Sequence, residues 1–314
     1  MSWITNFVRT KIKALISKQD VPDSLWQKCP GCQTMLHHQE RQKNLNVCHH
    51  CGHHLRMAVT ERLQMLFDQG QYQVIDLPKT IADPLKFRDK KRYGDRLKEA
   101  QLKTGRKDAI AVAQGTIGGE TAVVAAFDFS FMGGSMGAAV GDGLLTAARL
   151  AVMLKAPFIV VPSSGGARMQ EGALSLMQMP RSVVAVELVK EARLPYIVIL
   201  TDPTTGGVSA SFAMLGDIHI AEPGAQIGFA GTRVIQETIR ESLPDGFQTA
   251  EYLRDHGMVD IVTPRGELRG QLAAIIQILM RPKVAPGPQR DAETPRPGAK
   301  QAVPLRGKKD KAKA

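Results

Sequence analysis

Residues 195–212 read PYIVILTDPTTGGVSASF. An apolar run of strand length leads into a loop with paired glycines, and residues 157–172, PFIVVPSSGGARMQEG, show the same arrangement one helix earlier. Buried strands that alternate with helices are typical of an α/β domain whose strands pair mostly in parallel. In such sheets, ligands bind outside the carboxyl ends of the strands, where both glycine loops are expected. These two stretches therefore predict a fold class and the place of a site.

Neighbouring segments extend this pattern on both sides. Two β runs are predicted around a turn at Gly118-Gly119, and a helix over residues 144–156 is predicted to follow a third glycine-rich loop at 131–141. The helix between the two buried strands is expected to be interrupted near Pro180, because proline lacks the amide donor of a helix. Two further helices are expected at the ends of the domain: residues 61–70, capped by Thr60, and residues 267–281.

Composition divides the chain of 314 residues into four parts. The first part is expected to be a short amphipathic helix without the apolar core and cleavage site of a signal peptide. The last part is rich in Pro, Gly and Lys and is expected to be disordered. No apolar run has the length of a membrane span, so no membrane segment is predicted. A reducing cytoplasm is predicted from the missing export signal and from the cysteines at metal-binding spacing. The parts are a lead-in over 1–25, a cysteine module over 26–58, the large domain over 59–281 and a tail over 282–314.

The net charge of +11 lies at the two ends of the chain. Residues 281–314 hold ten Lys or Arg against three Asp or Glu, and residues 1–60 hold eight against three. Residues 61–280 hold 23 against 24. The large domain is therefore not expected to bind nucleic acid, although the cysteine module and the tail could contact polyanions. A solvated segment is the favoured interpretation of the basic tail.

All the cysteines of the chain lie in the small module, in the pattern C-x2-C-x15-C-x2-C. Two such knuckles can give one ion tetrahedral thiolate coordination, and a segment with so small a core needs a clamp of this kind to fold. A closed shell of four thiolates leaves no open position for catalysis. One structural Zn²⁺ per chain is therefore predicted, with nucleic-acid recognition as the alternative role of the module. The predicted ligands are Cys29, Cys32, Cys48 and Cys51.

Chemistry in the large domain is predicted to rest on backbone groups. Paired glycines let the backbone approach a ligand and leave N–H groups free to bind an oxyanion. Neither loop supplies a clear nucleophile and base, because six of the eight histidines lie in the cysteine module and only His219 and His256 lie elsewhere. Such a site suits a reaction through an enolate, in which the protein holds negative charge on a thioester oxygen.

One motif argues for a different enzyme class. Gly133, Ser135 and Gly137 match G-x-S-x-G after a strand-like run and before a helix, as in a nucleophile elbow. A serine hydrolase would need an acid and a base after Ser135 in the chain. Because the chain has 29 glycines, this five-residue pattern arises easily. The candidate partners are Asp202 or Asp217 as the acid and His219 or His256 as the base.

Two arginines stand close to the glycine loops in the sequence. Arg168 and Arg233 could each bind a carboxylate or a phosphate through the planar guanidinium group. Each could equally form an ion pair within the protein, and the sequence leaves both interpretations open.

Several longer blocks resemble those of a known family. They are KCPGC at 28–32, VCHHCGHHLRM at 47–57, FDFSFMGGSMG at 127–137, SSGGARMQEG at 163–172 and LPYIVILTDPTTGGVSASFAMLGD at 194–217. From residue 1 to about residue 281, the chain resembles the carboxyltransferase beta subunit of bacterial acetyl-coenzyme A carboxylase. The basic tail lies outside the resemblance.

This resemblance implies a crotonase-like α/β domain preceded by a four-cysteine zinc ribbon. It implies transfer of a carboxyl group from carboxybiotin, held on the biotin carboxyl carrier protein, to acetyl-CoA, which gives malonyl-CoA for fatty acid biosynthesis. The enzyme would be a heterotetramer of two alpha and two beta subunits with the site between them. ATP would be used by the partner biotin carboxylase.

The resemblance also implies roles for single residues. The N–H groups of Gly206 and Gly207 would be the catalytic oxyanion donors. The biotin ureido anion would take the proton from the acetyl methyl group, so that no protein base is needed. A second wall of the acyl-CoA pocket would be formed by Gly165, Gly166 and Ala167. Arg168, which follows them in the chain, is predicted to bind substrate as well, through its guanidinium group.

Overall fold

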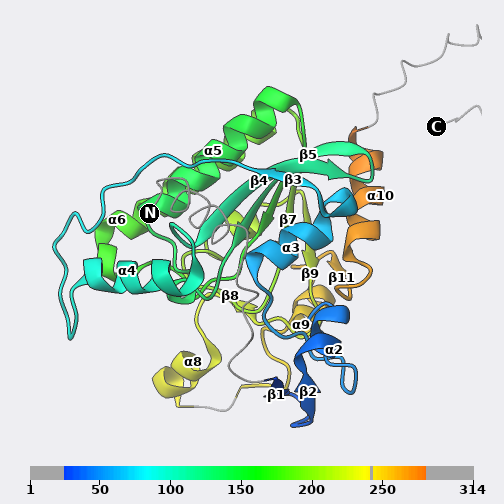
Figure 1. Ribbon diagram of the computed structural model, residues 1–314, viewed down its shortest axis with the longest axis horizontal. Coiled ribbons are helices and arrows are strands. Elements are labelled where there is room, and N and C mark those ends of the chain that lie inside the picture. Colours follow the sequence, from blue (N-terminus) through cyan, green and yellow to red (C-terminus); the bar gives the residue numbers. More distant parts are fainter. Residues whose placement is uncertain (1–24, 241–242, 281–314) are drawn as a thin grey trace, which may run out of the picture. The chain divides into compact units, whose positions relative to one another are not determined.

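A computed structural model describes residues 25–240 and 243–280, and the described part up to Met280 is a single compact unit (Figure 1). The predictions of an amphipathic helix in the lead-in and of disorder in the basic tail lie outside the described residues. No described helix has both the length and the apolar composition to cross a membrane.

A seven-stranded sheet forms the centre of the described residues, in the order β11-β9-β7-β6-β5-β4-β3. The strands from β5 to β11 pair in parallel, whereas β3, β4 and β5 pair antiparallel. The predicted α/β domain with largely parallel pairing is confirmed. The strands are β3 (Tyr72–Val74), β4 (Ile110–Ile117), β5 (Glu120–Phe127), β6 (Phe158–Val161), β7 (Tyr196–Leu200), β9 (Ile218–Ala221) and β11 (Ile261–Val262).

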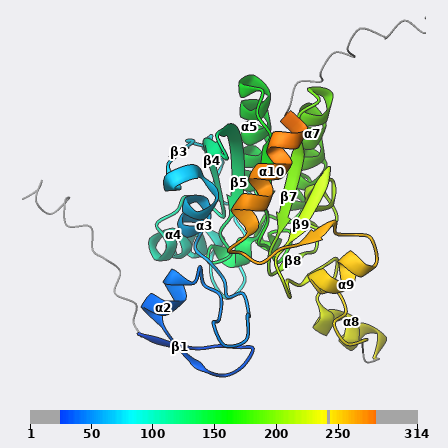
Figure 2. The same ribbon diagram turned by 90° about the vertical axis from the view of Figure 1, so that its right-hand side faces the viewer.

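Helices cover both faces of this sheet, as Figure 2 shows for α10 on one side and α5 and α7 on the other. Successive residues of a strand point to opposite faces, and β5 follows this rule. Val123 and Ala125 pack with α4, α5 and α7, and Val124 and Ala126 pack with α3 and α10. Both faces are therefore apolar, which explains the continuous apolar runs of the sequence. The helices are α3 (Val59–Leu66), α4 (Tyr93–Thr104), α5 (Ala138–Leu154), α7 (Gln178–Glu191) and α10 (Leu268–Met280).

Shorter elements connect these layers. A small parallel sheet pairs β8 with β10, and 3₁₀ turns precede or follow several strands. The elements are η1 (Asp68–Gly70), η2 (Met132–Gly134), η3 (Met169–Glu171), α6 (Ala173–Leu176), β8 (Thr204–Thr205), η4 (Phe212–Met214), β10 (Ile227–Gly228), α8 (Thr232–Ile239) and α9 (Ala250–Asp255).

The hairpin predicted at Gly118-Gly119 is confirmed. The two glycines connect β4 to β5 with φ values of +61° and +85°, a conformation that L side chains rarely adopt. A Cβ atom at Gly118 would also lie only 2.6 Å from Cβ of Ala273 in α10. The glycine at this position therefore serves both the turn and the packing of the last helix.

Two predicted helix boundaries are wrong. The first helix begins at Val59 after Ala58, not after Thr60, because the Glu61 carboxylate accepts a hydrogen bond from the Ala58 amide at 3.3 Å. It ends at Leu66, and Gly70 closes a separate 3₁₀ turn.

Helix α5 begins at Ala138, six residues before the predicted start. Gly141, which suggested a loop, is a packing position inside this helix, because a Cβ atom there would overlap the side chain of Gln178 in α7. The helical stretch around Pro180 is interrupted earlier than expected, at Met177. Pro180 itself lies in the first turn of α7, where its missing amide breaks no helical hydrogen bond.

The cysteine module contains a short antiparallel pair, β1 (Trp26–Lys28) and β2 (Met35–His37), followed by α2 (His38–Lys43). The side chain of Arg265 joins it to the sheet. Its Nη1 donates to the carbonyl oxygens of Leu45, Asn46 and Leu55 at 2.8, 3.3 and 3.0 Å. Its Nε and Nη2 donate to the carboxylate of Glu222, which directly follows β9, at 2.8 and 2.6 Å.

Candidate functional site

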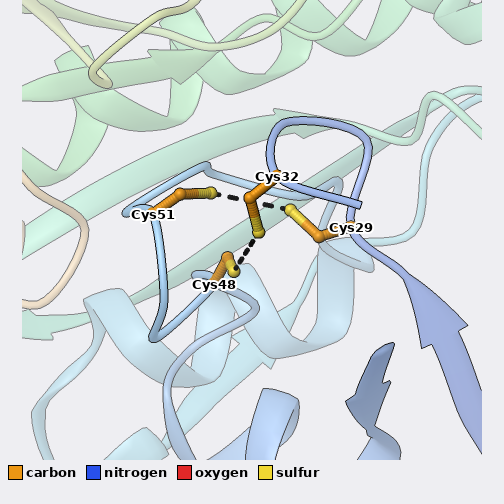
Figure 3. Close-up of side chains that lie close together, drawn as sticks. All are labelled: Cys29, Cys32, Cys48 and Cys51. Carbon is orange, nitrogen blue, oxygen red and sulfur yellow. Dashed lines mark hydrogen bonds between the residues drawn. The ribbon is translucent and has the colours of Figure 1, made fainter. Parts of the chain in front are cut away.

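The four cysteines come together in space, as predicted from their spacing (Figure 3). Their sulfur atoms all lie within 4.8 Å of one another, and none forms a disulfide. Two sulfur pairs, Cys29 with Cys51 and Cys32 with Cys48, are each separated by 3.7 Å. Four sulfurs at about 2.3 Å from a tetrahedral zinc ion would lie about 3.8 Å apart. The donor set and its geometry therefore fit a structural Zn²⁺.

Each knuckle of this cluster closes with a backbone hydrogen bond. The amide of Gln33 donates to the carbonyl of Cys29 at 2.9 Å, and the amide of Gly52 donates to the carbonyl of Cys48 at 2.8 Å. Gln33 and Gly52 have φ values of +64° and +73°. Among the described residues, no histidine joins the cluster of possible ligands.

The three glycine loops of the large domain also come together. The loop after β6 lies beside the loop after β7, because the amide of Ser164 donates to the carbonyl of Pro203 at 2.7 Å and the amide of Thr205 donates to the carbonyl of Ser164 at 3.0 Å. Close approach requires glycine here, since a Cβ atom at Gly206 would lie 3.1 Å from Cα of Gly166. Both glycines have positive φ, +64° and +111°.

The third glycine loop, after β5, braces the loop after β6 from its other side. The amide of Met136 donates to the carbonyl of Gly166 at 2.8 Å, and the amide of Arg168 donates to the carbonyl of Met136 at 2.9 Å. The amide of Gly165 donates to the carbonyl of Gly133 at 3.0 Å. The loop after β6 is therefore held between two others at the carboxyl edge of the sheet.

Most amides of the predicted site residues are already bonded within the protein. Besides Gly165, the amide of Gly206 donates to the carbonyl of Phe229 at 2.8 Å, and the amide of Gly166 donates to Ser164 Oγ at 3.0 Å. In this arrangement, these three amides are not available to a ligand.

Two amides of the predicted set are available. Within the described part of the chain, the N–H groups of Gly207 and Ala167 have no hydrogen-bond partner. Gly207 lies in a helical turn that begins at Gly206 and also leaves the amides of Val208 and Ser209 without a described partner, as the first amides of a helix are. A Cβ atom placed on Gly166 would lie 3.5 Å from the nitrogen of Gly207, so the loops that carry the two free amides are in contact. The site thus has donors on the two loops that follow the neighbouring strands β6 and β7.

Arg168 lies behind these loops, and its side chain is fully buried. Its guanidinium pairs with the carboxylate of Asp108 at 2.6 and 2.9 Å and contacts Glu171 at 3.2 Å. Burial lowers the pKa of Arg168, but the hydrogen bond and charge of Asp108 outweigh this effect and raise the pKa above its usual value. The predicted substrate-binding role of Arg168 stays a prediction, while its geometry is that of an internal ion pair. The side chain of Arg233, in α8, lies outside the described part.

The groups around Arg168 were not found from the sequence. Tyr93 begins α4, Asp108 precedes β4 and Glu171 lies in η3, so that they meet only in the folded chain. These three residues also line a cavity of about 670 Å³, together with residues 74–82. No pattern in the charged stretch before β4 singled out Asp108.

The residues of the serine-hydrolase alternative do not meet in the structure. Ser135 Oγ accepts a hydrogen bond from Arg168 Nε at 3.1 Å, and its φ of −64° is ordinary rather than the strained conformation of a nucleophile elbow. His219 accepts the amide of Gly216 at 3.2 Å, and His256 contacts the carbonyl of Tyr252 at 2.7 Å. No described acid–base pair reaches Ser135.

Comparison with known proteins gives a consistent result. The family model of the carboxyl transferase domain matches residues 57–266. The chain is 60% identical over 279 residues to acetyl-coenzyme A carboxylase carboxyl transferase subunit beta of Granulibacter bethesdensis, covering 89% of this chain and 91% of that protein. It is 53% identical to the protein of the same name in Brucella abortus, covering 94% and 99%.

Solved structures show the same fold. Transcarboxylase 12S with methylmalonyl-coenzyme A bound matches with a TM-score of 0.57 and 25% identity, covering 71% of this chain and 41% of that chain. A hetero-tetrameric Pseudomonas malonate decarboxylase matches with a TM-score of 0.53 and 23% identity, covering 75% and 91%.

The surroundings of Ser135 do not activate its hydroxyl group as a nucleophile. Ser135 should not react with a fluorophosphonate probe, because no described histidine can accept its proton. Intact-mass and peptide mass spectrometry of the labelled full chain would check this, with a known serine hydrolase labelled in parallel. Labelling at Ser135 that is lost in Ser135→Ala would revive the hydrolase hypothesis.

Proposed function

The chain belongs to the family of carboxyl transferase beta subunits of acetyl-coenzyme A carboxylase, and we propose on this basis that its paired glycine loops hold the thioester during carboxyl transfer. It is an enzyme component that works in biotin-dependent transfer of a carboxyl group to acetyl-CoA, which forms malonyl-CoA for fatty acid biosynthesis. Neither the comparisons nor the described residues favour a serine hydrolase or a nucleic-acid-binding protein.

The observation that carries the site assignment is the pair of free amides on neighbouring loops. Removing a proton from the acetyl methyl group puts negative charge on the thioester oxygen. Amides that are fixed before the substrate arrives stabilise this charge without reorganisation. We assign this role to the N–H groups of Gly207 and Ala167, whereas the amide of Gly206 is bonded to Phe229. The absence of a side chain at Gly166 allows the close approach of the two loops that carry these donors.

In the described part of the chain, no histidine is placed to act as the base for this proton. Of the two described histidines outside the cysteine module, His219 is bonded to a backbone amide, and burial lowers its pKa. When bound, carboxybiotin supplies both the carboxyl group and, after its loss, a ureido anion that can accept the proton. We propose that this chain holds the acyl group and that the carrier protein delivers the biotin.

Further partners follow from this proposal. The thioester and the biotin ureido each need donors, and the free amides of Gly207 and Ala167 are assigned to one carbonyl. We propose that an alpha subunit supplies the second set in a heterotetramer of two alpha and two beta subunits. The ATP-dependent carboxylation of biotin belongs to a separate biotin carboxylase. We also propose a cytoplasmic location, since a reducing compartment suits the free thiols of the ribbon.

Activity should therefore require a second subunit. Co-expressed with an alpha subunit, the chain should decarboxylate malonyl-CoA in the presence of free biotin, the reverse half-reaction. The purified chain alone should show no activity above the rate without protein, because it offers one set of donors for two carbonyls. A coupled spectrophotometric assay of acetyl-CoA release measures both. Full activity of the isolated chain would contradict the proposed division of the site.

A side chain at Gly207 should lower the turnover of the assembled enzyme more than one at any other glycine of the three loops that still allows folding. The φ of Gly207 is not in the left-handed region, and a Cβ atom would meet only the ends of Met179 and Met136, at 3.0 and 3.6 Å. Gly207→Val should therefore fold and assemble. Its side chain would obstruct the thioester or turn the amide, and loss of one oxyanion donor costs roughly a hundredfold to a thousandfold in kcat.

The matched control is Gly270→Val in α10, where a Cβ atom meets nothing within 4 Å. It should keep the wild-type kcat in the assembled enzyme. Near-normal turnover by assembled Gly207→Val would instead mean that other donors bind the thioester oxygen.

The ribbon should bind one zinc per chain, and zinc should stabilise the whole unit. Structural zinc contributes about 10–16 kcal/mol of binding free energy in small zinc-finger peptides. The double variant Cys48→Ser/Cys51→Ser should lose the metal and several kcal/mol of unfolding free energy, because Arg265 bonds to carbonyls that lie between and after the knuckles. Elemental analysis and urea unfolding measure these two effects. His49→Ser, next to Cys48, should keep its zinc, and full zinc occupancy in the double variant would refute the ligand assignment.

A further inference from the structure

The amide of Ala167 is aimed by a β-bridge between two glycine loops. Met136 pairs with Ala167 in a parallel bridge, so that the carbonyl of Gly166 and the amide of Arg168 both bond to Met136. In such a bridge, the N–H of the central residue points away from the bonded strand. The amide of Ala167 therefore points away from the loop after β5, on the side where the loop of Gly207 lies. Its direction depends on how firmly this bridge is held.

The side chain of Arg168 holds the bridge from the back. Nε and Nη2 donate to Oγ and the carbonyl oxygen of Ser135, at 3.1 and 2.9 Å, in the loop after β5. Because Arg168 directly follows Ala167, one side chain ties the two loops together beside the free amide. Asp108 binds the other edge of the guanidinium in bidentate fashion, which fixes its plane.

Glu171 and Tyr93 complete the cluster. Tyr93 donates its hydroxyl proton to Glu171 Oε1 at 2.6 Å and accepts from Arg168 Nη1 at 3.1 Å. Glu171 Oε2 accepts the amide of Ala138, the first residue of α5, at 2.7 Å. The cluster thus connects α4, α5 and the segment before β4 to the loop that carries Ala167. None of these side chains belongs to the predicted donors.

The guanidinium has no capacity left for a ligand. Six hydrogen bonds share its five N–H groups, and its side chain is fully buried. An arginine that bound a CoA phosphate or a carboxylate would need at least one accessible donor. The contacts of Arg168 all run to the protein instead.

We propose that Arg168, held by Asp108, Glu171 and Tyr93, is a positioning residue for carboxyl transfer: it fixes the bridge that aims the Ala167 amide at the thioester oxygen. This inference rests on the proposed function of the glycine loops. It assigns to Arg168 an effect on the rate of the chemical step and none on the affinity for the acyl-CoA.

The test uses the enzyme assembled with its alpha subunit, with malonyl-CoA decarboxylation as the reaction. Arg168→Lys keeps the charge but cannot span Ser135 and Asp108 at once. We expect kcat to fall by at least about tenfold, toward the hundredfold that loss of an oxyanion donor costs. KM for malonyl-CoA should change by less than about threefold, because no ground-state contact to the substrate is removed. Arg181→Lys, which alters a half-exposed pair with Asp142, is the matched control and should keep kcat.

The possible outcomes separate the two proposals. A wild-type assembly without activity would contradict the proposed function, whatever the variants do. With an active wild type, unchanged kcat in Arg168→Lys, or a raised KM with unchanged kcat, would overturn the positioning role. If Arg168→Lys does not assemble, Asp108→Asn serves as the second variant, because asparagine keeps the size of Asp108 and one acceptor for Arg168. In this variant kcat should also fall at constant KM, but by a smaller factor. Unchanged kcat there would equally overturn the proposal.

Discussion

The buried carboxylate of Glu222 is the constraint on which the arrangement of the chain depends. It follows β9 at the carboxyl edge of the sheet and is 2% exposed. A buried charge is tolerated only when it is paired and hydrogen-bonded. Two arginines from distant parts of the chain meet this need, Arg62 in α3 and Arg265 before α10. Burial raises the pKa of Glu222, but these two positive charges outweigh it and hold the pKa well below its usual range.

Arg265 also fixes the position of the cysteine module. Its remaining donors bind three carbonyl oxygens of the cysteine module, so that the module lies against the carboxyl edge of the sheet. The end of the module then lines a cavity of about 20 Å³, the size of one water, together with Ser163 and Asp202. These two residues stand at the start of the two glycine loops. The cysteine module and the loops are therefore parts of one packed region, although the sequence suggested separate units.

Local patterns of the sequence were sufficient for the ribbon cysteines, the hairpin at Gly118-Gly119 and the alternation of strands and helices. Each depends on residues close in the chain or on a period of burial. The start of α5 was predicted wrongly because Gly141 makes room for the side chain of Gln178, which lies 37 positions further along the chain. The partners of Arg168 were missed for the same reason. Asp108 lies 60 positions away and Tyr93 lies 75 positions away, and no local rule connects them.

A glycine in these loops does not always have an amide that is free to bind a ligand. Paired glycines mark where the backbone can come close to another group, and that group can be part of the protein as well as a ligand. At Gly206 it is the carbonyl of Phe229, and at Gly166 it is the hydroxyl of Ser164. Of the predicted set, the free amides belong to Gly207, in the first turn of a helical segment that begins at Gly206, and to Ala167, which is not a glycine. A residue next to the glycines can thus carry the donor because the glycines make room for it. In a site built from backbone groups, the side chains that matter are those that hold the backbone in place.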